Sequence, residues 1–139
     1  MQPLDLDQQT GRQCGGQRVL LVDDEPRIRE LCQKFLESRD YQVDVAGDGE
    51  EALCALTTGH YELLITDHLM PKLNGVDLVR RLRANGKDIP AILISGDMPY
   101  DEPDLRQLFN AGALLAKPFS MSQFLRAVGE TLGTTRRAA

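Results

Sequence analysis

The sequence predicts an α/β fold, in which a parallel sheet is covered by helices on both of its faces. Two observations predict it. Short apolar runs, which suit strands buried on both faces, alternate along the chain with stretches whose apolar residues recur at helical spacing. The alternation repeats through residues 18–133, which is typical of βα units joined by right-handed crossovers.

The first two units lie between residues 18 and 58. Residues 19–22 form an apolar run that predicts a buried strand, and residues 26–36 repeat apolar side chains at helical spacing behind Pro26. Residues 41–46 alternate apolar and polar side chains, which is typical of an edge strand with one wetter face. The pattern then predicts a short helix over residues 50–58.

The middle of the chain repeats the pattern with a stronger apolar signal. Residues 63–66 are apolar up to Asp67 and predict a buried strand. Residues 75–84 carry Val76, Val79 and Leu82 along one stripe and predict a helix. Residues 89–94 predict a fourth strand.

The last part of the chain predicts two helices and one very short strand. The fourth helix is expected over residues 103–110, after an irregular loop, and the fifth strand over residues 114–116. Apolar residues at a 3.6-residue period predict the final helix over residues 121–132. Residues 1–16 and 134–139 lack such periodicity, so we expect flexible tails on either side of one domain over residues 17–133.

Composition narrows the function classes. The chain has 139 residues, of which 42% are hydrophobic and 27% charged, as in a single globular domain. Its 16 basic and 21 acidic residues give a net charge of −5, which argues against direct binding of nucleic acid. No apolar run is long enough for a membrane span, and no secretory signal is present, so we expect a cytoplasmic protein.

The three cysteines show no zinc-binding spacing, and their use fits a reducing compartment. Cys32 and Cys54 fall inside the helical patterns and are expected to be small core residues, whereas Cys14 lies in the polar tail.

Polar residues follow four of the five predicted strands, at the point where each strand ends. They are Asp23, Asp24, Asp67, Ser95 and Lys117. The carboxyl ends of parallel strands meet at one edge of a sheet, where ligands bind in open α/β folds, so these side chains are expected to converge. Each of them alone suits a turn or a helix cap, but three clustered carboxylates are unfavourable without a compensating cation.

Oxygen ligands of this kind suit Mg²⁺. We expect Asp24 and Asp67 to bind the ion directly, Asp23 to bind it directly or through water, and the backbone carbonyl of Leu69 to add a ligand. One carboxylate oxygen of Asp67 is then free to attack a phosphoryl group, whose oxygens would be bound by Lys117 and the Ser95 hydroxyl.

The joint pattern resembles the receiver domain of two-component response regulators. Four motifs carry the resemblance, and together they are far more specific than an isolated acidic pair. They are Val22-Asp23-Asp24-Glu25, Asp67 followed by Met70-Pro71 and Gly75, Ser95-Gly96, and Lys117-Pro118-Phe119.

The resemblance implies a flavodoxin-like (βα)₅ fold with strand order 2-1-3-4-5. It also implies a single-domain receiver that accepts a phosphoryl group on Asp67 from a histidine kinase or phosphotransfer protein, with Mg²⁺ as cofactor. Its only catalytic activities would be self-phosphorylation and autodephosphorylation, so it would not be an enzyme in the ordinary sense. Lys117–Pro118 is expected to be a cis peptide bond. Output would pass to a downstream protein, or to a second copy in a homodimer, through the surface of the fourth helix, fifth strand and fifth helix.

One departure from the family pattern stands out, and a residue next to Asp67 has two interpretations. Leu114 occupies the position where family members often carry Tyr or Phe, so we expect signalling to rely on the loop after Ser95 and on the fourth helix rather than on an aromatic flip. His68, directly after Asp67, is predicted to be a partly exposed loop residue, and an influence on access to Asp67 is the alternative.

Two other functions stay open at the level of the sequence. A pseudo-receiver that only binds a partner is disfavoured by the intact acidic cluster. A phosphohydrolase with an aspartyl nucleophile is disfavoured because the usual second acid, two residues after the nucleophile, is replaced here by Leu69.

Overall fold

The structure, a computed structural model, describes residues 16–138, with side chains up to residue 133. The predicted tail 1–16, apart from Gly16, therefore lies outside the described residues, as do Cys14 and Ala139. The elements are β1 (Arg18–Val22), α1 (Pro26–Glu37), β2 (Gln42–Ala46), α2 (Gly49–Thr58), β3 (Leu63–Asp67), α3 (Gly75–Ala84), β4 (Ala91–Ser95), α4 (Leu105–Leu108), β5 (Ala113–Ala116) and α5 (Met121–Ala138).

The five strands form one parallel sheet in the order β2-β1-β3-β4-β5. This order confirms the flavodoxin-like topology that the resemblance implied. β1 lies second from one edge, next to the edge strand β2, and the chain then crosses back over β1 to add β3, β4 and β5 on its other side. The strand order therefore reverses between β1 and β3, and their carboxyl ends border the crevice where such folds bind ligands.

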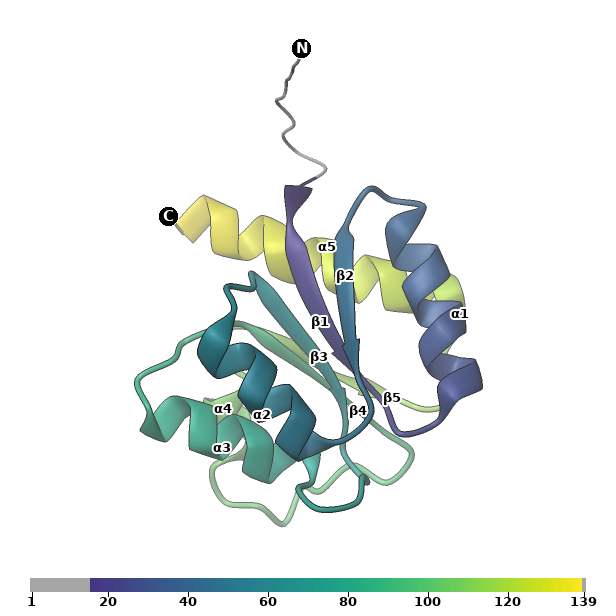
Figure 1. Cartoon of the computed structure of the whole chain (residues 1–139). Coiled ribbons are helices and arrows are strands. Elements are labelled where there is room, and N and C mark those ends of the chain that lie inside the picture. Colours follow the sequence, from purple (N-terminus) through teal and green to yellow (C-terminus); the bar gives the residue numbers. More distant parts are fainter. Residues whose placement is uncertain (1–15, 139) are drawn as a thin grey trace.

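Two layers of helices cover the sheet. Helices α1 and α5 lie on one face, and α2, α3 and α4 lie on the other (Figure 1). Cys32, Leu36, Phe124 and Val128 fill the first layer against β1, β3 and β4. Burial of each such large apolar side chain stabilises the fold by about 1.5–3 kcal/mol. The prediction that Cys32 belongs to the core is confirmed.

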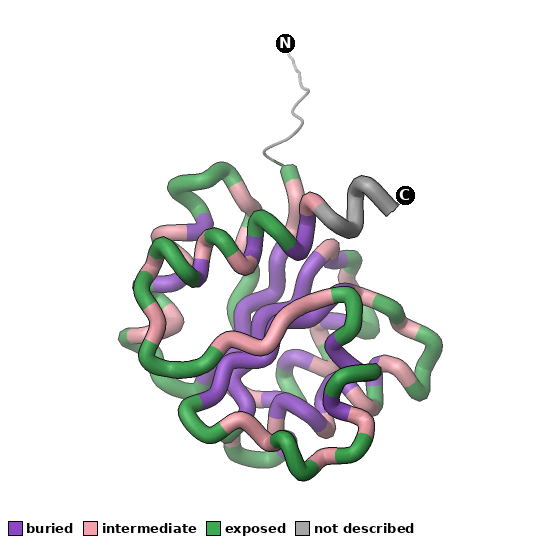
Figure 2. Tube along the Cα trace, turned by 180° about the vertical axis from the view of Figure 1, so that it is seen from behind, coloured by how far each residue is buried: buried purple, intermediate pink, exposed green. Residues whose placement is uncertain are grey.

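The central strands carry most of the buried surface. All residues of β3 and β4 are buried, and so are four of the five residues of β1, as the continuous purple strands in Figure 2 show. The edge strand β2 is more exposed than the central strands, as predicted, but its burial does not alternate strictly, because Val45 is 40% exposed. The other edge strand, β5, is only half-buried. Among the described residues, no helix combines the length and hydropathy that a membrane span requires.

Three elements differ from the sequence predictions by two residues or more at a boundary. β4 starts at Ala91 rather than at residue 89, because Pro90 has no N–H to donate, although its carbonyl accepts from Leu64. The fourth helix is a single turn, Leu105–Leu108, and is shorter than the predicted 103–110. α5 runs to Ala138 and so includes most of the segment 134–139 that the sequence predicts as a tail.

The prediction that Cys54 is a core residue is wrong, because its thiol is exposed. α2 buries Gly49, Ala52 and Leu56, which lie on one stripe of the helix. Cys54 lies two residues from both Ala52 and Leu56, which places it on the opposite face at 3.6 residues per turn.

Candidate functional site

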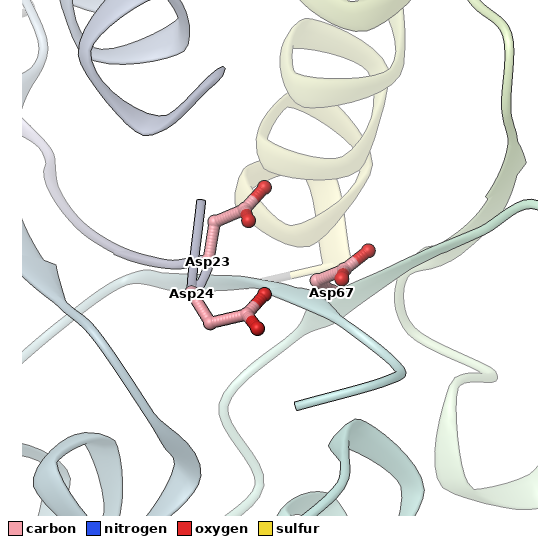
Figure 3. Close-up of side chains that lie close together, drawn as sticks. All are labelled: Asp23, Asp24 and Asp67. Atoms are coloured by element: carbon pink, nitrogen blue, oxygen red, sulfur yellow. The ribbon is translucent and has the colours of Figure 1, made fainter. Parts of the chain in front are cut away.

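Three carboxylates gather at the carboxyl ends of β1 and β3. Asp23, Asp24 and Asp67 each place a carboxylate oxygen within 4.8 Å of the others. Figure 3 shows the side chains of Asp23 and Asp24, which follow β1, next to one another, with Asp67 beside them. Asp67 is only 7% exposed and Asp23 is also buried, whereas Asp24 is exposed. The cluster is therefore open to solvent on one side.

The register of the sheet brings these residues together. Val22 pairs with Thr66, so the next residue on each strand, Asp23 and Asp67, emerges at the same level. The Asp23 carboxylate accepts a hydrogen bond from the Glu25 N–H at 2.9 Å, and its carbonyl accepts one from the Arg29 guanidinium at 2.8 Å. These bonds fix the turn from β1 into α1 and hence the direction of the Asp23 side chain.

Lys117 brings a positive charge from the end of β5. Its Nζ lies 2.9 Å from Oδ1 of Asp67. Burial disfavours the ammonium, but the hydrogen bond and charge of Asp67, with the charge of Asp23, hold the pKa of Lys117 above its ordinary value. The Lys117–Pro118 peptide bond is cis, as expected. The following Phe119 stacks on Phe124 of α5 with ring centroids 5.8 Å apart, which anchors the loop behind the lysine.

Ser95 ends β4 beside Lys117, whose backbone N–H donates to the Ser95 carbonyl at 2.9 Å. The hydroxyl, however, is bonded within its own loop. Its Oγ donates to the Asp97 carbonyl at 2.9 Å and accepts from the Asp97 N–H at 3.1 Å. The structure thus brings Asp23, Asp24, Asp67 and Lys117 together, while the Ser95 hydroxyl is bound to Asp97.

The charges of this cluster fit a divalent cation. Three carboxylates face one ammonium, so a formal excess of negative charge remains in a partly buried place. Burial raises the pKa of the Asp23 carboxyl above its ordinary value, and the Asp67 charge adds to the shift, against the lowering effect of the hydrogen bond from Glu25. A set of hard oxygen donors under such repulsion suits Mg²⁺. Leu69, the predicted source of a carbonyl ligand, follows in the β3–α3 loop with its side chain 70% exposed.

The start of α3 is packed tightly against the strand end that bears Asp67. A Cβ on Gly75 would lie 2.6 Å from the Asp67 carbonyl oxygen and 2.7 Å from a methyl of Leu93. The Gly75 N–H donates to the His68 carbonyl at 2.9 Å. Only glycine permits this approach, so α3 begins in direct contact with the backbone of the site.

The expectation of a partly exposed His68 is wrong, because the residue is 8% exposed. Its backbone is held between β4 and α3, with its N–H donating to the Ile94 carbonyl at 2.9 Å. Its Nδ1 is buried without a hydrogen-bond partner among the described residues. Nothing in the local sequence signals this burial, which arises from the packing of α3 at Gly75.

Replacing Asp23 by asparagine is expected to raise the thermal midpoint of the metal-free protein by a few degrees at neutral pH. A raised folded-state pKa means that the ionised carboxyl costs stability, and this cost is absent below the ordinary carboxyl pKa of about 4. The gain should therefore shrink as the pH falls through the raised pKa. Thermal unfolding in EDTA at a series of pH values measures it.

Mg²⁺ should stabilise the wild type but stabilise the Asp23→Asn variant less, because binding to the folded state alone raises the midpoint. Asp101→Asn, at an exposed turn far from the cluster in sequence, is the control for the loss of a charge. A lower thermal midpoint of Asp23→Asn than of wild type in EDTA would contradict the prediction.

Comparisons with known proteins place the chain among signalling domains. The family model described as "Response regulator receiver domain" matches residues 19–129. The response regulator MprA of Mycobacterium avium is 31% identical over 119 residues, which cover 86% of this chain and 52% of MprA. The chain thus spans about half the length of the curated relatives that it matches.

Solved structures agree with this match. Response regulator TrrA of Thermotoga maritima, in complex with Mg²⁺-BeF, has a TM-score of 0.74 and 32% identity, covering 83% of this chain and 98% of that one. The receiver domain of a sensor histidine kinase from Pseudomonas aeruginosa, with a magnesium ion in its active-site cleft, has a TM-score of 0.71 and 30% identity. That alignment covers 85% of this chain and 98% of the other.

Proposed function

Because this chain belongs to the family of response regulator receiver domains, we propose that it takes up a phosphoryl group on Asp67 in a Mg²⁺-dependent reaction and signals through the resulting change of its surface. The observation that carries the proposal is the buried carboxylate of Asp67, paired at 2.9 Å with Lys117 and flanked by the carboxylates of Asp23 and Asp24. A module that only bound partners would gain nothing from this repulsive cluster.

The chemical step is an in-line displacement. An oxygen of Asp67 attacks the phosphorus of a phosphohistidine, the phosphorus–nitrogen bond breaks, and the imidazole leaves with the bonding electrons and takes a proton from solvent. The product is an acyl phosphate on Asp67. Lys117 holds Oδ1 of Asp67 before the reaction, and its ammonium is placed to bind a phosphoryl oxygen afterwards.

Asp23, Asp24, Asp67 and the Leu69 carbonyl are the residues that would hold Mg²⁺. Bound there, the ion supplies positive charge that compensates the carboxylates and the incoming phosphoryl oxygens. The Ser95 hydroxyl would bind another phosphoryl oxygen, and for this it must exchange its bonds to Asp97. The Mg²⁺-BeF complex of TrrA and the magnesium-bound receiver of the Pseudomonas kinase support this assignment by similarity.

The partners follow from this chemistry. The donor of the phosphoryl group is a sensor histidine kinase or a phosphotransfer protein. The signal passes to a downstream protein, or to a second copy of this chain, that binds the α4-β5-α5 surface. The acidic balance of the chain supports a protein partner rather than direct nucleic acid binding. We propose a cytoplasmic location, where the kinase domains that supply phosphohistidine operate.

Incubation of the protein with acetyl phosphate and Mg²⁺ is expected to add the mass of one phosphoryl group, because a small acyl phosphate can replace the phosphohistidine donor. Intact-mass spectrometry measures the gain, and EDTA should abolish it. Release of phosphate over many turnovers from varied phosphate esters would instead indicate a phosphohydrolase. No modification in the presence of Mg²⁺ would contradict the proposal and favour a pseudo-receiver.

A further inference from the structure

Two arginines of α3 hold the two ends of the single-turn helix α4. At its N-terminal side, Arg80 donates to the Asp104 carboxylate through Nε at 3.0 Å and through Nη2 at 2.8 Å, and also to Glu102 at 2.7 Å. At its C-terminal side, Arg83 donates to the Leu108 carbonyl through Nε at 3.2 Å and through Nη2 at 2.9 Å. The arginines lie three residues apart, on the same side of α3.

The contact with Arg80 replaces the local capping of α4. Asp104 occupies the N-cap position, where an aspartate ordinarily accepts from the helix's own N–H groups, but it makes no such bond. Its carboxylate is held by Arg80 instead, and this hydrogen bond lowers the pKa of Asp104. The position and length of α4 thus depend on α3.

The two attachments differ in how easily they can be released. The side chains of Arg80, Glu102 and Asp104 are each more than a third exposed or close to it, so water can replace their ion pairs at little cost. The Arg83 guanidinium is half-buried and also donates to the carbonyls of Lys87 and Ile89. Loss of Arg83 would leave buried carbonyls without a donor.

The segment between Ser95 and Glu102, the first partner of Arg80, is short and is folded into turns. The Tyr100 N–H donates to the Met98 carbonyl at 2.8 Å, and the Glu102 N–H donates to the Pro99 carbonyl at 3.1 Å. Met98 packs against the core layer of α2, α3 and α4. Only a short, turn-forming segment therefore separates Asp97 from Glu102, so a movement of Asp97 can reach Glu102 when Ser95 exchanges its bonds.

We propose that Arg80 is a releasable latch on α4: it holds Glu102 and Asp104 while Asp67 is unmodified, and it loosens when Ser95 leaves Asp97 for the phosphoryl group, with Arg83 remaining as the fixed attachment. This inference rests on the proposed phosphoacceptor function. The ion pairs of Arg80 and the modification of Asp67 then oppose one another. Weakening these ion pairs therefore favours the modification.

Arg80→Gln in the full chain is the test, with Arg81→Gln as a matched control, since Arg81 is an exposed arginine on the same helix. The probe is beryllofluoride with Mg²⁺, a phosphoryl mimic, titrated at equilibrium. We expect Arg80→Gln to bind the probe about two- to fivefold more tightly than wild type, and Arg81→Gln to bind it as wild type does. In the probe-free protein, hydrogen exchange in residues 97–108 should be faster in Arg80→Gln alone.

A merely structural ion pair would lower the thermal midpoint of Arg80→Gln but leave its affinity for the probe equal to that of the control. That result would overturn the latch, and so would unchanged hydrogen exchange. Failure of the wild type to bind beryllofluoride would instead contradict the proposed phosphoacceptor function, so the two failures are distinguishable.

Discussion

Replacement of Asp67 by asparagine is expected to abolish phosphoryl uptake from acetyl phosphate. An amide oxygen is a far weaker nucleophile than a carboxylate, and Asp67 is the carboxylate that Lys117 contacts at 2.9 Å. Asparagine keeps the shape of the side chain and an acceptor for Lys117, so the fold should persist. Intact-mass spectrometry after incubation with Mg²⁺ should show only the unmodified mass, while circular dichroism stays that of wild type.

The control for this substitution is Asp101→Asn, an exposed aspartate in the β4–α4 loop. It removes one negative charge and makes the same change of mass, but it should gain a phosphoryl group as wild type does. A phosphoryl group that still attaches to Asp67→Asn would place the acceptor on another residue, and peptide mapping would then identify it.

Gly112→Ala is expected to destabilise the fold by about 3 kcal/mol. Gly112 precedes β5 and lies against the backbone of Ala91 at the start of β4, so a Cβ there would overlap the Ala91 carbonyl oxygen and approach its nitrogen to 2.9 Å. Both neighbours are backbone atoms of a buried, hydrogen-bonded strand and have little freedom to move. Urea unfolding measures the loss as a lower midpoint at an unchanged slope.

Gly129→Ala on α5 is the matched control. A Cβ at Gly129 meets no atom within 4 Å, and alanine suits a helix better than glycine by about 0.5–1 kcal/mol. The same chemical change should therefore stabilise the protein at one position and damage it at the other. Equal stability of Gly112→Ala and wild type would show that β4 and β5 can separate at this point.

The sheet and the position of the site could be predicted because both depend on local signals. Apolar runs fully buried in a parallel sheet end abruptly, and Asp23, Asp67 and Ser95 stand at these ends. The parallel arrangement then brings the ends together whatever their separation along the chain. The order of the strands could be predicted only from the family resemblance, because periodicity along the chain does not show which strands lie next to one another in the sheet.

Two of the predictions that were wrong concern contacts between different elements, and a third concerns the phase of a single helix. The fourth helix is a single turn whose N-cap residue, Asp104, is bound by Arg80, 24 residues earlier, and nothing in the helical pattern reports that pair. The burial of His68 depends on the close approach of α3 at Gly75. The apolar neighbours of Cys54 in the sequence suggest a core position, whereas the phase of the buried stripe of α2 turns this residue outward.

Helix α3 connects the carboxylate site with the segment that precedes α4. Its first residue, Gly75, packs against the Asp67 backbone. Its sixth residue, Arg80, forms an ion pair with Asp104 just before α4. At 1.5 Å per residue, these two points are about 7.5 Å apart along the helix axis. An insertion or deletion of one residue between them would turn Arg80 by about 100° away from its partners while leaving Gly75 in place. The spacing within this one helix thus fixes where Arg80 lies relative to Asp67, the proposed phosphoacceptor.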